Sequence, residues 1–478
     1  MNRRFDLYLI GWLLVLGSAF LCLPLAVAGL YGEPLAPWFG SIAVGIGAGL
    51  ALVRVRPPRD RRLHPRDGFL VVGGAWVAVS LLGALPYLFA GALGPVDAIF
   101  EAVSGITTTG STVMADVTVV PRGLLLWRAM SQWIGGMGII LFTIAILPLL
   151  GIGGMQLFKA EVPGPVADKV QPRLANTARA LWGIYVGLTA AEAGLLRLAG
   201  LGWYDAVCHA FTTLATGGFS TRNGSIGEFD SATVEWIVIL FMLLAGTNFV
   251  LHSRLLTGRG RSLLADAELR YYLGVTAVGT VLLGVTVHQA GEAPLDTIRT
   301  AAFQTVSLLT TTGYCTTDFE LWAPFAQLVV LVLLVPGGMS GSTGGGVKSL
   351  RMVLAVRSLR ATVHRLAHPH AVRPVKYGGQ VVDESVLAGI WAFLTAYALI
   401  AVVAAAVVAA HGYDLVTSIS AALTALGNVG PGLGEIGASD TFGHFPALVK
   451  LVLAACMLFG RLEIFTLLAL CSRHFWRR

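Results

Sequence analysis

The sequence predicts an all-α polytopic membrane protein in which four tandem helix–pore loop–helix repeats surround one central pore, preceded by two N-terminal transmembrane helices. Composition is the first observation behind this prediction. Of the 478 residues, 55% are hydrophobic and only 12% are charged, whereas about a quarter of the residues in a soluble domain are charged. The other two observations are a series of long apolar segments and a short threonine- and glycine-containing motif that recurs four times.

The apolar segments define the candidate membrane helices, each of which needs roughly 17 to 25 mostly apolar residues. We predict ten, over residues 7–30, 36–53, 69–93, 123–150, 178–200, 232–256, 271–290, 322–356, 386–410 and 446–471, and we expect 322–356 to be broken. The first segment resembles a signal peptide, but its apolar core of about 24 residues exceeds the roughly 7 to 15 of such a peptide. We therefore expect it to be retained as a helix.

The recurring motif emerges when the ten residues before each of four glycines are aligned. The four windows read FEAVSGITTTG (100–110), CHAFTTLATGG (208–218), FQTVSLLTTTG (303–313) and SAALTALGNVG (420–430). The glycines recur about every 100 residues, which indicates a tandem repeat. Each window is too short to span the bilayer and lies between two full spans, so each predicts a short pore helix followed by a re-entrant loop. The predicted division is 1–66 for two N-terminal helices, then pore repeats at 67–170, 171–262, 263–376 (with the broken inner helix) and 377–478.

The four loops predict one shared pore. Irregular backbone at membrane depth must be buried in protein or line a water-filled path, because each unpaired polar group there costs several kcal/mol. In potassium channels, four loops supply carbonyl oxygens that replace the hydration shell of the ion, and glycine provides the backbone torsions that such loops need. The predicted filter residues are Thr108, Thr109, Gly110, Ser111, Thr216, Gly217, Gly218, Phe219, Thr311, Thr312, Gly313, Tyr314, Asn428, Val429, Gly430 and Pro431. Because the fourth loop lacks the initial threonine, we expect fewer ordered ion sites than in a symmetric tetramer.

An aspartate lies at the start of each pore segment, at Asp97, Asp205, Asp296 and Asp414. We expect these carboxylates to cap free backbone amides and to complement the positive end of the helix dipole. A second, compatible interpretation is that the four carboxylates surround the outer vestibule and raise the local cation concentration.

Two features predict unusual structure deeper in the membrane. Residues 337–346 contain six glycines, and glycine costs about 1 kcal/mol per helical position relative to alanine, so this segment should unwind and line the cavity. Arg461 lies within the last span, where an arginine facing the cavity would oppose a permeating cation. We expect no pairing between Arg461 and Glu463 within the helix, and we expect Arg128 and Arg197 to reach the membrane surface. A glycine-rich packing helix and a structural Arg461 remain alternatives.

The positive charges are grouped in the linkers. Most Lys and Arg residues lie in 1–6, 54–67, 151–179, 254–270, 348–376 and 473–478. Since cytoplasmic loops carry the Lys/Arg excess, both termini should face the cytoplasm and the four loops should face outward. The net charge of +7 therefore reflects topology and not nucleic-acid binding. The five cysteines have no paired spacing, which indicates neither disulfides nor a zinc site.

Several motifs together resemble the Trk/Ktr/HKT superfamily of cation transporters, most closely the TrkH-like bacterial potassium uptake subunits. They are EAVSGITTTGST (101–112), QWIGGMGIILF (132–142), TGGFST (216–221), TTTGY (310–314), GSTGGGVKSLR (341–351), GNVGPGLG (427–434) and GRLEIFTLL (460–468). The resemblance implies a gated potassium pathway in the bacterial inner membrane, and glycine at position 110 favours potassium over sodium. It places a gate at Gly337, Gly338, Gly341, Ser342, Thr343, Gly344, Gly345, Gly346, Lys348 and Arg461. It also implies a homodimer, regulated by a cytoplasmic ring of nucleotide-binding (TrkA-like) subunits on the basic linkers, with no cofactor other than potassium as substrate.

Other functions stay open at this point. A sodium-permeable or ion-coupled symporter of the same superfamily would use the same motifs. A carrier with midplane binding predicts paired helix breaks in two halves, whereas the sequence indicates four loops and one separate break. An intramembrane serine protease would use Ser340 in GMSG (338–341), but it needs a base near the serine, and His209 and His288 lie near predicted outer ends.

Overall fold

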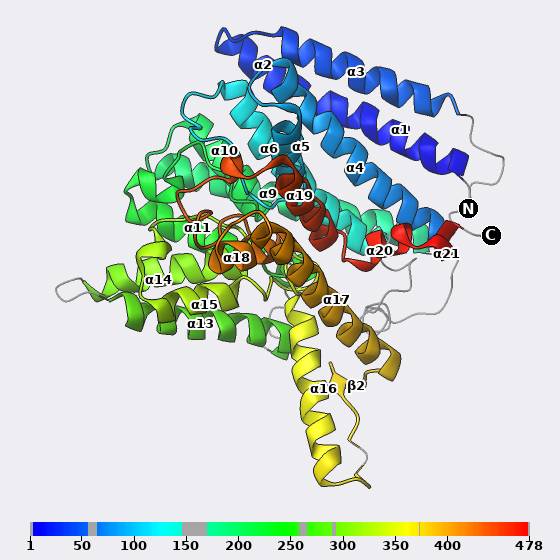
Figure 1. The fold of residues 1–478 in the computed structure, drawn as a ribbon, viewed down its shortest axis with the longest axis vertical. Helices are drawn as coiled ribbons and strands as arrows, with labels where there is room; N and C mark the ends of the chain where they lie inside the picture. The colour runs from blue at the N-terminus through cyan, green and yellow to red at the C-terminus, as the bar shows by residue number, and fades with distance from the viewer. Residues whose placement is uncertain are drawn as a thin grey trace.

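The computed structural model describes residues 3–55, 65–145, 170–256, 258, 265–288, 293–371 and 373–476. Helices account for nearly all of its regular structure (Figure 1), as predicted. The chain begins with α1 (Arg3–Phe20), α2 (Cys22–Leu30) and α3 (Ala36–Val53). Helix α1 packs against α3 and against α4 (Pro65–Phe89), so the N-terminal helices lie on one flank of the bundle.

The rest of the chain repeats one pattern. An outer helix leads into a pore helix in the pairs α4 and α5 (Pro95–Ile106), α9 (Val170–Leu198) and α10 (Trp203–Leu214), α13 (Ala267–Val287) and α14 (Pro294–Leu309), and α17 (Glu384–Ala409) and α18 (Leu415–Gly427). Members of each pair pack together. Proline or aspartate at the helix start and a left-handed residue just beyond the end keep the pore helices short.

The inner helices follow the loops. They are α6 (Arg122–Ala145), α11 (Ala232–Ala245) with α12 (Phe249–Leu256), α15 (Pro324–Leu333) with α16 (Ser349–Ala367), and α19 (Ala447–Arg461) with α20 (Phe465–Cys471) and the short α21 (Arg473–Trp476). Inner helices α6, α11 and α19 each contact a pore helix of another repeat, α10, α14 and α5 respectively. The contact between α19 and α5 joins the last repeat to the first, so the repeats close on one another.

The inner helices are more broken than predicted. The expected break between α15 and α16 is present. The segments 232–256 and 446–471 were predicted to be continuous, but they bend by 99° and 118°. The first bend falls at Gly246–Asn248 and the second at Leu462–Ile464, where Glu463 and Ile464 have positive φ. Contacts with other segments stabilise both bends, and a hydropathy pattern does not record such contacts.

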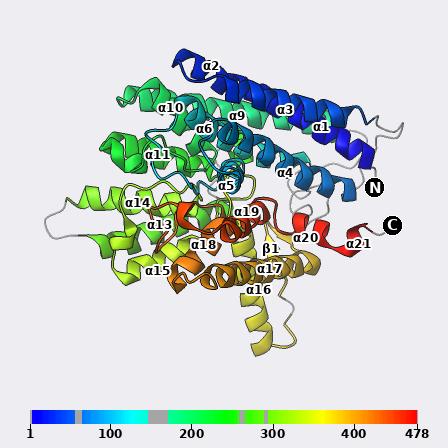
Figure 2. The same cartoon turned by 45° about the horizontal axis from the view of Figure 1, so that its top comes forward.

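By length and composition, five described helices could cross a membrane, or seven if each bent pair is one span. The other predicted spans correspond to α6, α9 and the broken pair α15 and α16. Helix α16 leaves the bundle together with a short antiparallel hairpin, β1 (Lys376–Tyr377) and β2 (Gln380–Val381), in which Lys376 pairs with Val381. Figure 2 shows this projection, with both chain ends at another edge of the molecule.

Candidate functional site

The four predicted loops have the same backbone conformation. In each loop a residue with left-handed φ lies two positions before a glycine that also has positive φ. The first residues are Thr108 (54°), Thr216 (52°), Thr311 (61°) and Asn428 (55°), and the glycines are Gly110 (83°), Gly218 (75°), Gly313 (78°) and Gly430 (109°). Asparagine is among the few non-glycine residues that adopt this region readily, so the substitution in the fourth loop preserves the backbone.

The loops also meet in a closed ring, which we call the glycine ring (Gly110, Gly218, Gly313 and Gly430). A Cβ atom on any ring glycine would lie under 3.0 Å from a backbone carbonyl oxygen of another loop. The pairs are Gly110 with Gly217, Gly218 with Thr312, Gly313 with Val429, and Gly430 with Thr109. The contacts run from loop one to two, two to three, three to four and four to one. Side chains cannot be accommodated at this approach, so the glycines are required by packing as well as by φ.

The first and fourth loops are joined by additional hydrogen bonds. Asn428 Nδ2 donates to Thr109 Oγ1 at 3.0 Å and to the Met457 carbonyl at 2.9 Å. Ser111 Oγ donates to the Gly430 carbonyl at 3.1 Å. The amide of Asn428 thus makes a cross-loop bond at the position where the fourth loop lacks the threonine of the other three.

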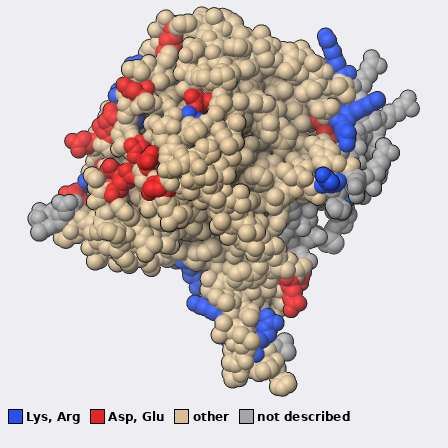
Figure 3. All heavy atoms as spheres, in the orientation of Figure 1, with Lys and Arg blue, Asp and Glu red and all other residues tan. Residues whose placement is uncertain are grey.

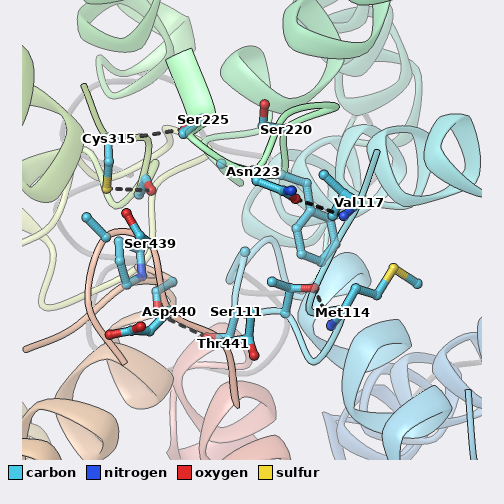
Figure 4. Close-up of a pocket in the computed structure, with 18 of the residues that line it drawn as sticks. Ser111, Met114, Val117, Ser220, Asn223, Ser225, Cys315, Ser439, Asp440 and Thr441 are labelled. Carbon is cyan, nitrogen blue, oxygen red and sulfur yellow. Dashed lines mark hydrogen bonds between the residues drawn. The ribbon is translucent and has the colours of Figure 1, made fainter. Parts of the chain in front are cut away.

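A cavity of about 90 Å³ opens on one side of the glycine ring. Residues that follow all four ring glycines line it, and Figure 4 shows them facing one another around the space. Labelled members come from each of the four segments that follow a ring glycine: Ser111, Met114, Val117, Ser220, Asn223, Ser225, Cys315, Ser439, Asp440 and Thr441. We call this cavity the vestibule. Its position next to the ring makes it the entrance to any path through the ring.

The predicted capping role is wrong for three of the four aspartates, while their role around the outer vestibule stays a prediction. Only Asp414 caps its helix, accepting hydrogen bonds from the amides of Val416 and Thr417. The other three lie in the first turn without a side-chain cap bond. They pair with cations instead: Asp97 with Lys450 (2.6 Å), Asp205 with Arg222 (3.2 Å) and Asp296 with Arg299 (2.6 Å). None of the four lines the vestibule, and the acidic residue in its described wall is Asp440.

The glycine-rich segment lies on the opposite side of the ring. It is irregular, as predicted, and we call residues 337–346 the inner loop. Gly346 donates its N–H to the Gly427 carbonyl at the end of α18 (2.8 Å), and Thr343 Oγ1 donates to the Leu214 carbonyl at the end of α10 (3.0 Å). Gly345 donates its N–H to Thr311 Oγ1 at 2.6 Å. The inner loop therefore contacts the C-terminal ends of pore helices and a residue of the third filter loop.

The bend in the second inner helix anchors the inner loop from the side. Met339 donates its N–H to the Gly246 carbonyl at 2.8 Å, and Phe249 donates to the Gly341 carbonyl at 3.1 Å. Backbone groups freed by each break therefore satisfy one another. The sequence offered a weak signal for this bend, the Gly-Thr-Asn triplet at 246–248, which the span prediction passed over.

Two buried cations contact the inner loop. Arg461, 2% exposed, donates to the Thr343 carbonyl at 2.7 Å and to the Gly135 carbonyl at 3.2 Å. Lys348 Nζ donates to the Gly344 carbonyl. Glu463 pairs with Arg351 on α16 at 2.5 Å. This partner differs from Arg461, in line with the prediction that Arg461 and Glu463 do not pair within the helix. Both cations are thus held by carbonyl groups at the inner face of the ring.

Sequence reasoning missed residues that support the loops from behind. Gln132 donates from Nε2 to the Gly217 carbonyl at 2.6 Å and accepts from the Phe219 amide at 3.2 Å. Arg128, expected at the membrane surface, is 2% exposed and forms an ion pair with the buried Glu101 at 2.8 Å. Helix α6 carries both residues, and the QWIGGMGIILF motif (132–142) includes Gln132 but not Arg128.

Comparisons with known proteins agree with this geometry. The model of the TrkH family, described as cation transport protein, matches residues 42–477. The chain belongs to the TrkH family of cation transport proteins. It is 41% identical to the Trk system potassium uptake protein TrkH of Salmonella typhimurium, with 100% of both chains covered, and 35% identical to TrkG of Escherichia coli, with 98% of both covered.

A solved structure supports the same assignment. The crystal structure of the potassium transporter TrkH from Vibrio parahaemolyticus matches with a TM-score of 0.92 and 38% identity over 100% of both chains. The fold is therefore that of an all-α membrane protein, and the family is one of transporters and not of enzymes. Among the described residues, the two histidines considered for the protease alternative have other partners: His209 bonds the Asp205 carbonyl and Ser220, and His288 bonds Thr297, while the Ser340 amide bonds Glu268.

Proposed function

We propose that this protein takes up potassium ions across the bacterial inner membrane through the path that the glycine ring encloses. The observation that carries the proposal is the ring itself: four loops, each in the same left-handed conformation, close on one another. Backbone oxygens of such loops can replace the hydration shell of an alkali cation. The names of the relatives, potassium uptake proteins, support potassium as the ion.

The electrostatics of the pore helices favour a cation at the ring. The C-terminal end of a helix carries roughly half a negative charge, and the C-terminal ends of the pore helices at Leu214 and Gly427 lie against the inner loop. We assign the filter to the sixteen residues predicted from the sequence, from Thr108–Ser111, Thr216–Phe219, Thr311–Tyr314 and Asn428–Pro431. No Asp, Glu, Lys or Arg occurs among them, so carbonyl and hydroxyl oxygens would bind the ion.

We assign the gate to the inner loop together with Lys348 and Arg461. Both cations lie on the inner side of the ring and would repel a permeating ion. The inner loop occupies the space beneath the third and fourth filter loops, as its bonds to Thr311 and Gly427 indicate. We therefore interpret this conformation as closed. Conduction requires the inner loop to separate from Arg461.

Surface charge supports the proposed orientation. In Figure 3, acidic side chains gather over the loops near α10, α11 and α14, whereas basic side chains lie near the chain ends and along α16. Cytoplasmic segments carry the Lys/Arg excess. We infer that both termini and α16 face the cytoplasm and that the vestibule faces outward. The repeat boundaries that we predicted, at 67, 171, 263 and 377, remain our division of the chain.

The projecting α16 is the candidate contact for a regulatory partner. It carries Arg357, Arg360 and Arg365 beyond the bundle, followed by the β1–β2 hairpin. We propose that a cytoplasmic ring of nucleotide-binding subunits docks on this basic surface and on the linkers 151–179 and 254–270, of which 151–169, 257 and 259–264 lie outside the described residues. We also propose a homodimer with one pore in each chain.

Complementation tests the transport proposal. Expression in a bacterium that lacks potassium uptake should restore growth at low external potassium, and Gly110→Ser or Gly313→Ser should reduce the rescue. Flux into proteoliposomes under defined gradients separates the alternatives: sodium flux equal to potassium flux would support the sodium-permeable alternative, and dependence on a proton or sodium gradient would support a symporter. Absence of any rescue by the well-expressed wild-type protein would contradict the proposal.

Replacing Arg461 tests the gate assignment. Arg461→Ala removes two hydrogen bonds from a charged donor, each worth about 1.5 to 3 kcal/mol, so potassium flux without a partner should rise at least about tenfold. Arg197→Gln is the matched control, because Arg197 lies near an outer helix end and bonds only the Leu201 carbonyl among described groups. Unchanged flux in Arg461→Ala would refute the gate assignment.

A further inference from the structure

The pore helices share a position that the filter assignment does not explain. The residue nine places before the ring glycine is Glu101, His209, Gln304 and Ala421 in the four repeats. The first three are completely buried, and each contacts the irregular segment that follows the ring glycine of its own repeat. His209 Nε2 lies 2.9 Å from Ser220 Oγ, and Gln304 Nε2 donates to Thr316 Oγ1 at 3.3 Å. In the fourth repeat, Ser420 Oγ bonds the Leu433 carbonyl at 2.7 Å instead.

The first repeat alone uses a carboxylate at this position. Glu101 accepts hydrogen bonds from Thr112 Oγ1 (3.0 Å) and from the Val113 amide (3.0 Å), two and three residues after Gly110. Its Oε1 also accepts a hydrogen bond from Arg128 Nε at 2.8 Å. Bonds to a charged group are roughly twice as strong as neutral ones. The segment after Gly110 is therefore held more strongly than the segments after the other three ring glycines.

Arg128 extends this attachment to the second repeat. Its Nη1 donates to the Ser220 carbonyl at 3.2 Å, and its Nη2 donates to Thr112 Oγ1 at 3.2 Å. The guanidinium group lies 4.0 Å from the ring centroid of Phe219, the residue after ring glycine Gly218. One side chain thus contacts the outer ends of the first two filter loops, and it also forms part of the vestibule wall.

We propose that the Glu101–Arg128 ion pair is a positioning pair that sets the discrimination between potassium and sodium. The pair does not bind the ion. It fixes the separation of the first two filter loops, and a site that selects by geometry must hold its ligands to within about 0.5 Å. This inference depends on the proposed filter function.

Two conservative variants test the proposal. Glu101→Gln keeps the shape and an acceptor oxygen but removes the charge, and Arg128→Lys keeps the charge but loses the planar fork that reaches both loops. Each should lower the ratio of potassium to sodium flux in proteoliposomes by about tenfold, the factor expected when a hydrogen bond to a charged group is lost. Potassium flux itself should persist, because the glycine ring is intact.

A matched ion pair supplies the control. Glu235 and Arg299 form an ion pair of 2.9 Å between α11 and α14. Among the described contacts, this pair does not reach a segment that follows a ring glycine. Glu235→Gln should leave the flux ratio unchanged, and thermal unfolding of all three variants in detergent reports lost stability separately. If Glu101→Gln does not fold, Arg128→Lys, which keeps a cation beside Glu101, decides the matter. A wild-type flux ratio in folded Glu101→Gln or Arg128→Lys would overturn the inference, whereas absence of potassium flux in the wild type would overturn the proposed function instead.

Discussion

The glycine ring and the inner loop beneath it are held in different ways. The ring repeats one contact four times, a glycine against a carbonyl of the adjacent loop. The inner loop occurs once, and it reaches α10 through a threonine hydroxyl and α18 and Thr311 through two backbone N–H groups. Each ring loop is confined by two others, so no loop can move alone. Under the proposed function, the repeated contact serves selection, and the single inner loop, which bonds the ring loops through Thr311 among the described groups, separates to open the path.

The largest effect should follow from breaking the ring. In Gly313→Ala, the Cβ atom would lie under 3.0 Å from the Val429 carbonyl, at a φ of +78°. Strain of this kind costs about 1 to 3 kcal/mol before any clash, so potassium uptake should fall about a hundredfold. Gly412→Ala is the control, since Gly412 also has positive φ (+93°) but nothing lies within 4 Å. Equal losses in both variants would show that the closeness of the loops is unimportant.

A smaller effect should follow from loosening the inner loop. Thr343→Val removes the inner-loop hydroxyl that donates to the Leu214 carbonyl at the end of α10. Loss of one neutral hydrogen bond, about 1 kcal/mol, should raise potassium flux about fivefold by favouring separation of the inner loop. Thr247→Val provides the comparison, because the Thr247 hydroxyl bonds the Leu243 carbonyl of α11. A similar rise in both variants would show that the Thr343 bond does not hold the gate closed.

The smallest effect concerns an acidic group outside the ring. Burial, followed by the charges of Asp440 and Asp318, raises the pKa of Glu320 to about 7. Because the folded protein binds this proton more tightly than the unfolded chain, the carboxyl group stabilises the fold most below about pH 4.5 and progressively less as the pH rises through 7. Glu320→Gln should therefore flatten the decline of the melting temperature between about pH 5 and 8. An unchanged pH profile would show that Glu320 is not protonated there.

Much of the fold was predictable because its signals are local. Apolar segments located the outer helices, and the aligned windows located all four pore helices and loops to within a few residues. The inner-loop glycines predicted the break between α15 and α16. The bends at Gly246 and Glu463 were not predicted, because contacts with other segments stabilise them: the inner loop bonds Gly246, and Arg351 pairs with Glu463.

In the candidate site, too, local signals identified some features, whereas features that depend on distant contacts were missed. Residue type and spacing singled out the ring glycines, the inner loop and Arg461, which the structure brings together, while their roles in selection and gating stay predictions. Helix capping was wrong for Asp97, Asp205 and Asp296; Lys450, the partner of Asp97, lies 353 residues away in sequence, beyond the reach of local signals. Arg128 was misassigned because hydropathy places an arginine near a span end at the surface, whereas Glu101 and the Ser220 carbonyl satisfy its charge in the interior.

The sequence by itself determined a membrane protein with four re-entrant loops, because composition, segment length and glycine placement act within a few residues of where they are read. Only the tertiary structure decided that the loops close into a ring, that the inner loop lies against it, and which charges pair. Those outcomes depend on distances between segments hundreds of residues apart, which hydropathy and spacing do not specify.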